Sequence, residues 1–451
     1  MNNNSLKVCL ISLGCDKNLV DSEHISGILA DKGYQLCDDE AVADVIIINS
    51  CCFIHDAKEE SINMIFEMAQ YKETGNLKAL VLCGCLAQRY SEEIKEEVPE
   101  VDICIGTSAY EDIIKALDEF FEKHNVVQVL KDIDYLAGVD KPRYITPYSS
   151  YAYLKIAEGC DKHCSYCIIP KIRGNFRSVP MEDLIKEANQ IAQKGIKELV
   201  LVAQETTMYG TDIYGKKSLH ILLSKLSQIE GIKWIRVLYC YPEEIYDELI
   251  DEMAQNEKVC NYLDIPIQHA SDIILKRMGR RTSNAELRTI IGKLRSKIPD
   301  IVLRTSLITG FPGETPEDHK CLLDFVKDIQ FDRLGVFTYS QEEGTPAAQF
   351  DNQVDEEIKE QRRDEIMTLQ QSIVFDKTND YVGKEVVAII EGKLPNEDVY
   401  LARTYMDAPD VDSNIFVNSR ADLLTGELVR VKVTAAKDYD LVGDITKRLE
   451  V

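Results

Sequence analysis

Short apolar runs alternate with helical stretches along most of this 451-residue chain. Between residues 7 and 122, the expected strands are residues 8–13, 45–48, 77–82 and 101–105. The helices expected between and after them are residues 18–32, 57–71, 92–98 and 110–123. Strands and helices that alternate at this length predict an open parallel sheet with helices on both faces.

The alternation resumes at residue 151 and repeats six times. The expected strands are residues 151–157, 198–203, 234–240, 262–267, 301–308 and 334–339. The expected helices are residues 181–194, 219–228, 243–254, 284–297 and 316–329. Right-handed strand–helix units in one sheet curl toward a barrel, so six of them predict a partial (β/α)6 barrel. Its active face is expected at the carboxyl ends of the strands.

The pattern changes again near the end of the chain. After a charged helix at 355–381, short β runs at 385–390, 399–404, 415–417 and 428–434 predict a small all-β barrel. A chain of this length also exceeds one ordinary core. We therefore predict an α/β protein with an N-terminal sheet domain at 1–125, a linker with some edge-strand character at 126–150, the partial barrel at 151–379 and the β domain at 380–451.

Three cysteines follow directly on the first strand of the expected barrel. Cys160, Cys164 and Cys167, here called the loop trio, have the spacing CxxxCxxC. Three thiolates on one loop can hold three corners of a metal cluster, whereas structural zinc sites and fully liganded clusters normally use four protein ligands. The loop trio therefore predicts a [4Fe–4S] cluster with one iron open to a substrate or cofactor. Zinc in these cysteines is the alternative that metal analysis would distinguish.

A second set of cysteines is scattered along the N-terminal domain. Cys15, Cys51 and Cys85, here called the strand-end trio, each follow an expected strand. Ligands bind beyond the carboxyl ends of strands in open α/β sheets, so these thiols are expected to converge on a second three-thiolate site. Cys52 and Cys83 compete with Cys51 and Cys85, and spacing alone does not choose between them. Two other cysteines fall within strands and are expected in the core, Cys9 and Cys104.

Other polar residues follow the barrel strands. Gln204 and Glu205 come after the second strand, and His269 after the fourth; a single histidine is more often just hydrogen-bonded than catalytic. A turn with two glycines at 310–315 follows the fifth strand and would let backbone approach a ligand closely. Arg304 lies inside that strand and needs an anionic partner, for which a cofactor carboxylate is plausible.

Composition limits where the protein acts and what it contacts. No apolar run reaches the roughly 18 residues of a membrane span, and residues 1–5 are polar with no secretory signal after them, so we expect a cytoplasmic protein. The 14 cysteines are then reduced, which favours metal or redox chemistry over disulfides. Net charge is −25, and residues 380–451 contain 14 Asp and Glu against 9 Lys and Arg. A nucleic-acid reader should be basic, so a basic protein partner is the better prediction.

Together these features resemble the methylthiotransferases among the radical S-adenosylmethionine (SAM) enzymes, whose final domain is a TRAM-type β domain. The resemblance covers nearly the whole chain and includes SLGCDKNLVDSE at residues 12–23 and GCLAQRY at residues 84–90. The family's second cysteine ligand is followed by glycine, which places that ligand on Cys51 and makes Cys52 a departure. The same comparison puts Cys83 on a position that is not a ligand.

Within this family, the wording of the motifs is similar to the branch that modifies a ribosomal protein. LGCxKNLVDSE from residue 13, QETTxYG at 204–210 and RLGVFTYS at 333–340 carry that similarity. The tRNA-modifying branches usually have a tyrosine-glycine-cysteine-x-methionine-asparagine version of the first motif. The resemblance implies methylthiolation of the β-carbon of one aspartate in small-subunit ribosomal protein S-twelve, a basic protein.

The resemblance also implies the cofactors. The loop trio would hold a [4Fe–4S] cluster that cleaves SAM to a 5′-deoxyadenosyl radical, and the strand-end trio a second [4Fe–4S] cluster that carries sulfide or persulfide. Tyr166 would pack near the adenine, with Gln204, Glu205 and Arg304 as further candidate SAM contacts. An electron donor such as a flavodoxin or ferredoxin is implied as a partner.

Two other functions remain as alternatives. A tRNA adenosine methylthiotransferase would use the same chemistry, but the first motif and the acidic final domain count against it. A non-catalytic iron–sulfur module for electron transfer or binding does not need two clusters that each leave an iron open.

Overall fold

The computed structural model of this protein describes residues 6–138, 141–146 and 148–449. The polar residues 1–5 and Pro147 of the expected linker lie outside the described residues. The chain forms two compact units. The first consists of Met1–Ile145, Ala157–Val179 and Ser340–Thr345, and the second of Thr146–Ile156, Pro180–Tyr339 and Pro346–Val451. Two segments from within the expected barrel domain thus belong to the unit that contains the N-terminal sheet.

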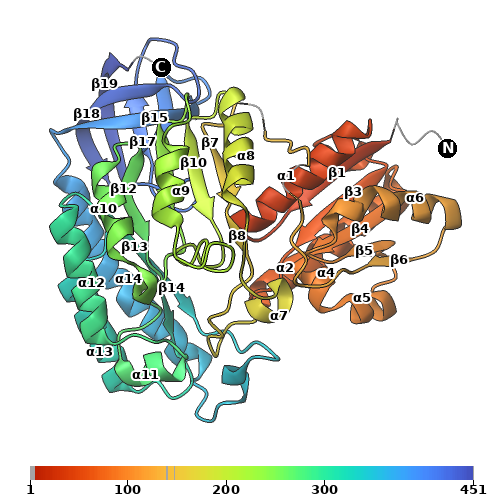
Figure 1. Cartoon of the computed structure of the whole chain (residues 1–451), viewed down its shortest axis with the longest axis horizontal. Helices are drawn as coiled ribbons and strands as arrows, with labels where there is room; N and C mark the ends of the chain where they lie inside the picture. Colours follow the sequence, from red (N-terminus) through yellow and green to blue (C-terminus); the bar gives the residue numbers. More distant parts are fainter. Residues whose placement is uncertain (1–5, 139–140, 147, 450–451) are drawn as a thin grey trace. The chain divides into compact units, whose positions relative to one another are not determined.

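The first unit is built on a six-stranded parallel sheet with the strand order β2-β1-β3-β4-β5-β6 (Figure 1). Its strands are β1 (Lys7–Ser12), β2 (Gln35–Leu36), β3 (Val45–Ser50), β4 (Ala79–Gly84), β5 (Ile103–Ile105) and β6 (Val127–Val129). The four expected strands are confirmed. The short edge strand β2 was not predicted, and β6 lies in the segment for which we expected edge-strand character.

Helices cover both faces of this sheet, as predicted. They are α1 (Asp16–Asp31), α2 (His55–Ala69), α3 (Tyr71–Thr74), α4 (Cys85–Arg89), α5 (Ser91–Glu97) and α6 (Ile113–Lys123). Successive strand residues point to opposite faces, so Ile46 and Ile47 on β3 fall in two separate apolar clusters. Residues of α1 and α6 pack in one cluster, and residues of α2, α4 and α5 in the other.

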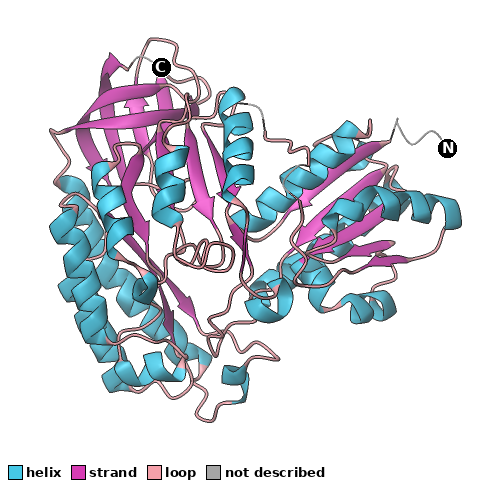
Figure 2. Ribbon diagram, in the orientation of Figure 1, coloured by secondary structure: helices cyan, strands magenta, loops and turns pink. Residues whose placement is uncertain are grey.

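The second unit contains a six-stranded parallel sheet whose strands follow the chain in order, β14-β13-β12-β11-β10-β7. Figure 2 draws the strands in magenta, with helices in cyan. The strands of this sheet are β7 (Tyr151–Lys155), β10 (Glu198–Val202), β11 (Trp234–Val237), β12 (Val259–Asp264), β13 (Val302–Thr309) and β14 (Arg333–Thr338). The helices are α8 (Met181–Gln193), α9 (Leu219–Leu226), α10 (Asp247–Gln255), α11 (Asp272–Arg277), α12 (Asn284–Lys297) and α13 (Pro316–Ile329). The sheet stays open, which confirms the partial (β/α)6 barrel.

A closed five-stranded barrel follows the long helix α14 (Glu356–Asn379) in the same unit. Its strands are β15 (Glu385–Lys393), β16 (Val399–Thr404), β17 (Ile415–Asn418), β18 (Leu428–Lys437) and β19 (Asp440–Arg448). The small all-β barrel is confirmed, although β19 was not predicted. In the part of the chain that the structure describes, no helix is both long and apolar enough to cross a membrane.

Buried ion pairs join the closed barrel to the open sheet within this unit. Glu198 on β10 accepts hydrogen bonds from Arg236 on β11 (2.7 Å) and from Arg403 on β16 (2.8 Å). None of these three residues is more than 1% exposed. Buried charges without partners would lower the stability of the unit. This network therefore stabilises the packing of β16 against the open sheet.

Candidate metal centres

The strand-end trio lies at the carboxyl ends of three neighbouring strands. Cys15 caps the start of α1 after β1, Cys51 follows β3, and Cys85 begins α4 directly after β4. A Cβ on Gly14 would lie 2.9 Å from the Cys51 sulfur, so the loop before Cys15 passes against Cys51. Burial raises the pKa of the Cys51 thiol to about 12, and the charges of Cys85 and Cys15 add to that rise. The structure therefore brings the three expected cysteines together.

Side-chain amides and hydroxyls fix these strand ends. Asn18 donates from Nδ2 to the carbonyls of Leu13 and Ser50, both at 3.0 Å, and so ties the first strand end to the second. The Ser61 hydroxyl accepts from the backbone N–H of Cys51 (3.0 Å) and donates to the Cys51 carbonyl (2.9 Å). Neither Asn18 nor Ser61 was predicted as a site residue, although Asn18 lies inside the motif at 12–23.

The competing cysteines are deeply buried. Cys52 is fully buried in the apolar cluster that α2 helps to form, and Cys83 is buried in the cluster on the opposite face, with α1 and α6. Burial raises the pKa of both thiols. Cys9 and Cys104 are also buried core residues within strands, as predicted.

The loop trio lies in the same compact unit, between the short strand β8 (Ala157–Glu158) and helix α7 (Ile169–Arg173). The N–H of Cys160 donates to the carbonyl of Gly174 (3.1 Å), and the N–H of Cys167 donates to the carbonyl of Cys164 (3.0 Å). Gly159 has φ +78, and a Cβ there would meet the Asn175 carbonyl oxygen at 2.1 Å. The loop therefore requires glycine at this position.

The three loop thiols also interact. Burial raises the pKa of the Cys167 thiol, and the charges of Cys164 and Cys160 raise it further. Cys160 and Cys164 are buried, whereas Cys167 and Tyr166 are half-buried. Each trio thus offers three sulfur donors, a set that fits a cluster held by three thiolates with one iron open.

A single-ion site is not formed by these thiols. Over the described ranges, no three His, Cys, Asp or Glu side chains lie close enough together to hold one metal ion. A cluster does not need that closeness, because each thiolate binds a different iron.

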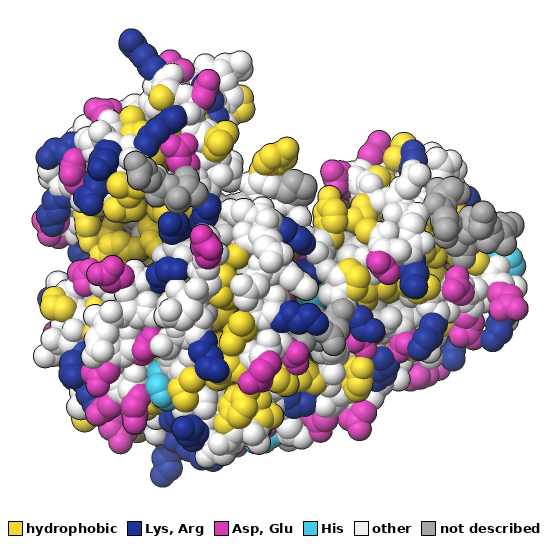
Figure 3. Space-filling view, turned by 45° about the horizontal axis from the view of Figure 1, so that its top comes forward, with side chains coloured by type: hydrophobic (Ala, Val, Ile, Leu, Met, Phe, Trp, Pro, Cys, Tyr) yellow, Lys and Arg dark blue, Asp and Glu magenta, His cyan; other side chains and the backbone are white. Residues whose placement is uncertain are grey.

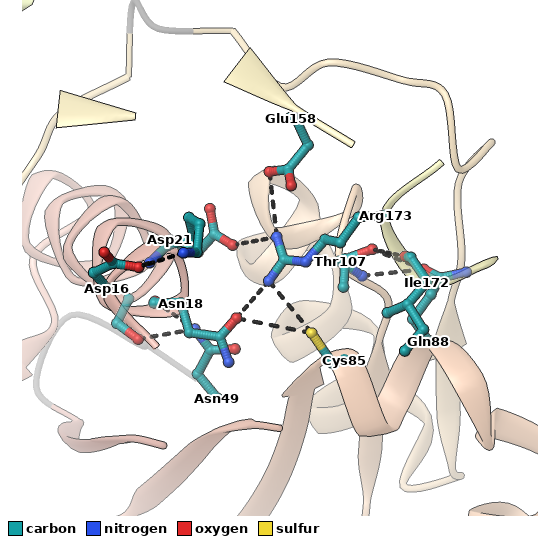
Figure 4. A network of polar contacts seen from close by, with 12 residues as sticks. Asp16, Asn18, Asp21, Asn49, Cys85, Gln88, Thr107, Glu158, Ile172 and Arg173 are labelled. Carbon is teal, nitrogen blue, oxygen red and sulfur yellow. Dashed lines mark hydrogen bonds and ion pairs between the residues drawn. The ribbon is translucent and has the colours of Figure 1, made fainter. Parts of the chain in front are cut away.

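Arg173, the last residue of α7, connects the loop that holds one trio to a sulfur of the other (Figure 4). Its Nη1 pairs with Asp21 (2.8 Å) and Glu158 (3.2 Å). Its Nη2 donates to the Oδ1 of Asn18 and lies 3.5 Å from the Cys85 sulfur. This arginine was not predicted, because its partners on α1 and α4 are remote in sequence.

The expected polar residues of the barrel belong to the second unit. Glu205 follows β10 and is 1% exposed, and its Oε1 accepts hydrogen bonds from the N–H (2.9 Å) and the hydroxyl of Thr207. Gln204 beside it is half-buried. His269 is buried, and its Nδ1 accepts from the N–H of Ser271 (2.9 Å), as expected of a hydrogen-bonded histidine.

Arg304 was expected to need an anionic partner, and the structure supplies such partners within the protein. Arg304 does have anionic partners, but they are Asp264 on β12 (3.0 Å) and Asp412 (3.5 Å), which lies between β16 and β17. The protein's own carboxylates therefore meet the need that suggested a cofactor carboxylate.

The final β domain uses part of its acidic excess in the same way. Asp407 pairs with Arg333 on β14, so at least Asp407 and Asp412 face arginines of the open sheet. On the face drawn in Figure 3, acidic and basic side chains are interspersed. The acidic surface available to a partner is therefore smaller than the count of residues suggests.

Comparisons with known proteins cover nearly the whole chain. Residues 7–106 match an uncharacterized protein family, UPF0004, residues 154–326 match the Radical SAM superfamily, and residues 382–446 match the TRAM domain. The radical SAM methyltransferase TsrM from Kitasatospora setae, solved with tryptophan and a SAM analogue, has TM-score 0.53 at 13% identity. That match covers 73% of this chain and 72% of TsrM, and at this identity it shows the fold alone.

Curated relatives are much more similar. The ribosomal protein uS12 methylthiotransferase RimO of Lachnoclostridium phytofermentans is 58% identical over 438 residues, which cover 97% of this chain and 99% of the relative. RimO of Clostridioides difficile is 51% identical, over 98% of this chain and 100% of the relative. Identity at this level over full length shows that the chain belongs to the ribosomal protein uS12 methylthiotransferase family.

Proposed function

We propose that this protein is a radical-SAM methylthiotransferase that adds a methylthio group to the β-carbon of an aspartate of ribosomal protein S-twelve. The observation that carries the proposal is that one compact unit contains two sets of three cysteines, one on a single loop and one at three strand ends. The curated relatives, whose names specify uS12, support the choice of substrate.

In this proposal, the loop trio holds the [4Fe–4S] cluster that binds SAM, and the strand-end trio holds a second [4Fe–4S] cluster. When bound, these groups supply the electron, the radical and the sulfur of the reaction. The protein provides the thiols and orients them: Asn18 and Ser61 fix the strand ends, and the Gly159 turn fixes the loop. Tyr166, Gln204, Glu205 and Arg304 stay candidate SAM contacts.

The state of the thiols before metal binding follows from their burial. The pKa of Cys51 is raised to about 12, and those of Cys85 and Cys167 are also raised. These thiols are therefore neutral at pH 7 in the metal-free protein, and they must lose protons to bind iron. Loading of either site is thus expected to release protons and to become more favourable as the pH rises.

The partners complete the proposal. A flavodoxin or ferredoxin supplies electrons, a sulfide or persulfide source supplies sulfur, and basic S-twelve binds partly through exposed acidic residues of the final domain. Opposite charges steer such encounters. Because Asp407 and Asp412 are paired with arginines, the residues for this role are among the exposed ones, such as Asp422.

A reconstitution experiment tests the proposed function. The protein is loaded anaerobically with iron and sulfide, then given SAM, a reductant, and either S-twelve or unmodified tRNA. Mass spectrometry is expected to find the methylthio group on an aspartate of S-twelve; modification of tRNA alone would overturn the substrate assignment. Cys164→Ala is expected to abolish SAM cleavage, whereas Cys85→Ala should retain cleavage and lose sulfur insertion.

A further inference from the structure

One buried cation connects the two cysteine trios. Arg173 lies six residues after Cys167, yet its guanidinium lies on the strand-end trio, with Nη2 3.5 Å from the Cys85 sulfur (Figure 4). Its side chain is 2% exposed. At this distance a guanidinium N–H donates a hydrogen bond to sulfur, and such a bond strengthens when the sulfur is a thiolate.

Neutralising the guanidinium does not require this contact with sulfur. Asp21 and Glu158 both pair with Nη1, so two carboxylates already balance one positive charge. The Oδ1 of Asn18 accepts a hydrogen bond from Nη2, while the Nδ2 of Asn18 donates to the carbonyls of the strand ends. Asn18 is held in place by these bonds and so fixes the direction of Nη2. The surroundings therefore hold Nη2 against Cys85 independently of any attraction by the sulfur.

The charges around Cys85 act on its sulfur in opposite directions. The guanidinium of Arg173 brings positive charge to within 3.5 Å of the Cys85 sulfur, and the carboxylate of Glu158, 3.2 Å from Nη1, brings negative charge to the same surroundings. Arg173 thus favours negative charge on this sulfur, and Glu158 opposes it. A cluster bound there gains negative charge on reduction, so the same two residues should move its reduction potential in opposite directions. Hydrogen bonds to cluster sulfurs and the net charge nearby are the usual determinants of that potential.

We propose that Arg173 is a positioning residue that donates a hydrogen bond to the Cys85 ligand and makes the reduction potential of the cluster on the strand-end trio more positive. The proposal rests on the proposed function, because that function assigns Cys85 as a cluster ligand. It adds a link between the sites: the segment that carries the loop trio also tunes the sulfur-supplying site.

The test uses the full chain with Cys160, Cys164 and Cys167 replaced by alanine, so that only the strand-end trio can hold a cluster. In this background, Arg173→Met, Arg173→Lys and Glu158→Gln are compared with the parent. Iron and sulfide content is measured first, and the midpoint potential is then obtained by redox titration followed by electron paramagnetic resonance.

The expected result has a sign for each variant. Arg173→Met shifts the midpoint to more negative potential. Arg173→Lys shifts it less, because lysine keeps the positive charge but not the planar set of N–H donors of the guanidinium. Glu158→Gln leaves the midpoint unchanged or shifts it to more positive potential, although it too breaks an ion pair of Arg173. Both variants break the ion pair of Arg173 with Glu158, so a negative shift in Arg173→Met without a negative shift in Glu158→Gln is the signature that a merely structural role would not produce.

Each other outcome is decisive. An unchanged midpoint in Arg173→Met at full cluster content overturns the inference, and so does a negative shift in Glu158→Gln. If Arg173→Met holds too little cluster to titrate, the comparison of Arg173→Lys with Glu158→Gln decides by the same signs. A parent that binds no iron would refute the second cluster site itself, and so would overturn part of the proposed function together with this inference.

Discussion

Replacement of Gly14 by alanine should empty the strand-end site while leaving the loop site loaded. Gly14 has φ +86, a conformation that costs a residue with a Cβ about 1–2 kcal/mol. A Cβ there would also lie 2.7 Å from the Cβ and 2.9 Å from the sulfur of Cys51, closer than packed atoms approach. Overpacking of this kind costs about 1–3 kcal/mol more. Cys51 must therefore move away from the position in which it meets Cys15 and Cys85.

The matched control is Gly195→Ala. Gly195 has φ +89, but nothing lies within 4 Å of its added Cβ, so this variant has the backbone strain without the displaced cysteine. After anaerobic reconstitution, Gly195→Ala should bind about eight irons per chain, as two [4Fe–4S] clusters require, and Gly14→Ala about four. Denaturation of the metal-free proteins, followed by circular dichroism, should show a larger loss of stability for Gly14→Ala. Eight irons in Gly14→Ala would refute the geometry proposed for the site.

Three further predictions follow from the described contacts. Cys51→Ala should lose the iron of the strand-end site, whereas Cys52→Ala should keep it, as iron analysis of the reconstituted variants would show. Glu198→Gln leaves two buried arginines without their shared carboxylate and should cost about 3–5 kcal/mol of unfolding free energy. The fluorescence of Trp234, the single tryptophan, reports this unfolding from the neighbouring strand. A loss below about 1 kcal/mol would contradict the expectation. Burial lowers the pKa of His269 from 6.5 to about 3, so below pH 6.5 unfolding takes up a proton and the free energy of unfolding decreases as the pH is lowered. About 2 kcal/mol should be lost between pH 6.5 and about 5. Denaturation of His269→Asn at the two pH values should not show this loss.

Elements with strong local signals were predictable from the sequence. The helices α12 and α13 begin and end where the periodicity placed them. For α13 the reason is visible: Thr315 and Asp318 form a capping box, and Pro316 occupies the first turn. The missed strands β2 and β19 lack such signals. β2 has two residues and thus no period, and charged residues interrupt the apolar pattern of β19.

The candidate site was predictable where the chemistry lies in residue type. The CxxxCxxC spacing indicated the loop trio, and a parallel sheet brings strand ends together, which indicated a second site of three thiols. The choice of Cys51 over Cys52 and of Cys85 over Cys83 came from the family resemblance. The partners of charged side chains could not be selected. Arg173 meets Asp21 across 152 residues of chain, and Arg304 meets Asp412 from a different barrel. Such pairs depend on how the elements pack, which a single sequence does not encode locally.

The division of the chain into units affects how the enzyme can move. The backbone passes five times from one unit to the other, at residues 145, 156, 179, 339 and 345. The loop trio lies in Ala157–Val179, a segment of the first unit, so both trios belong to the same unit. Any rotation of one body against the other leaves the separation of the two proposed clusters constant. A fragment that stops at residue 145 would keep the strand-end trio but lack Arg173 and the loop trio, so a cut at the expected linker would divide the first unit instead of isolating it.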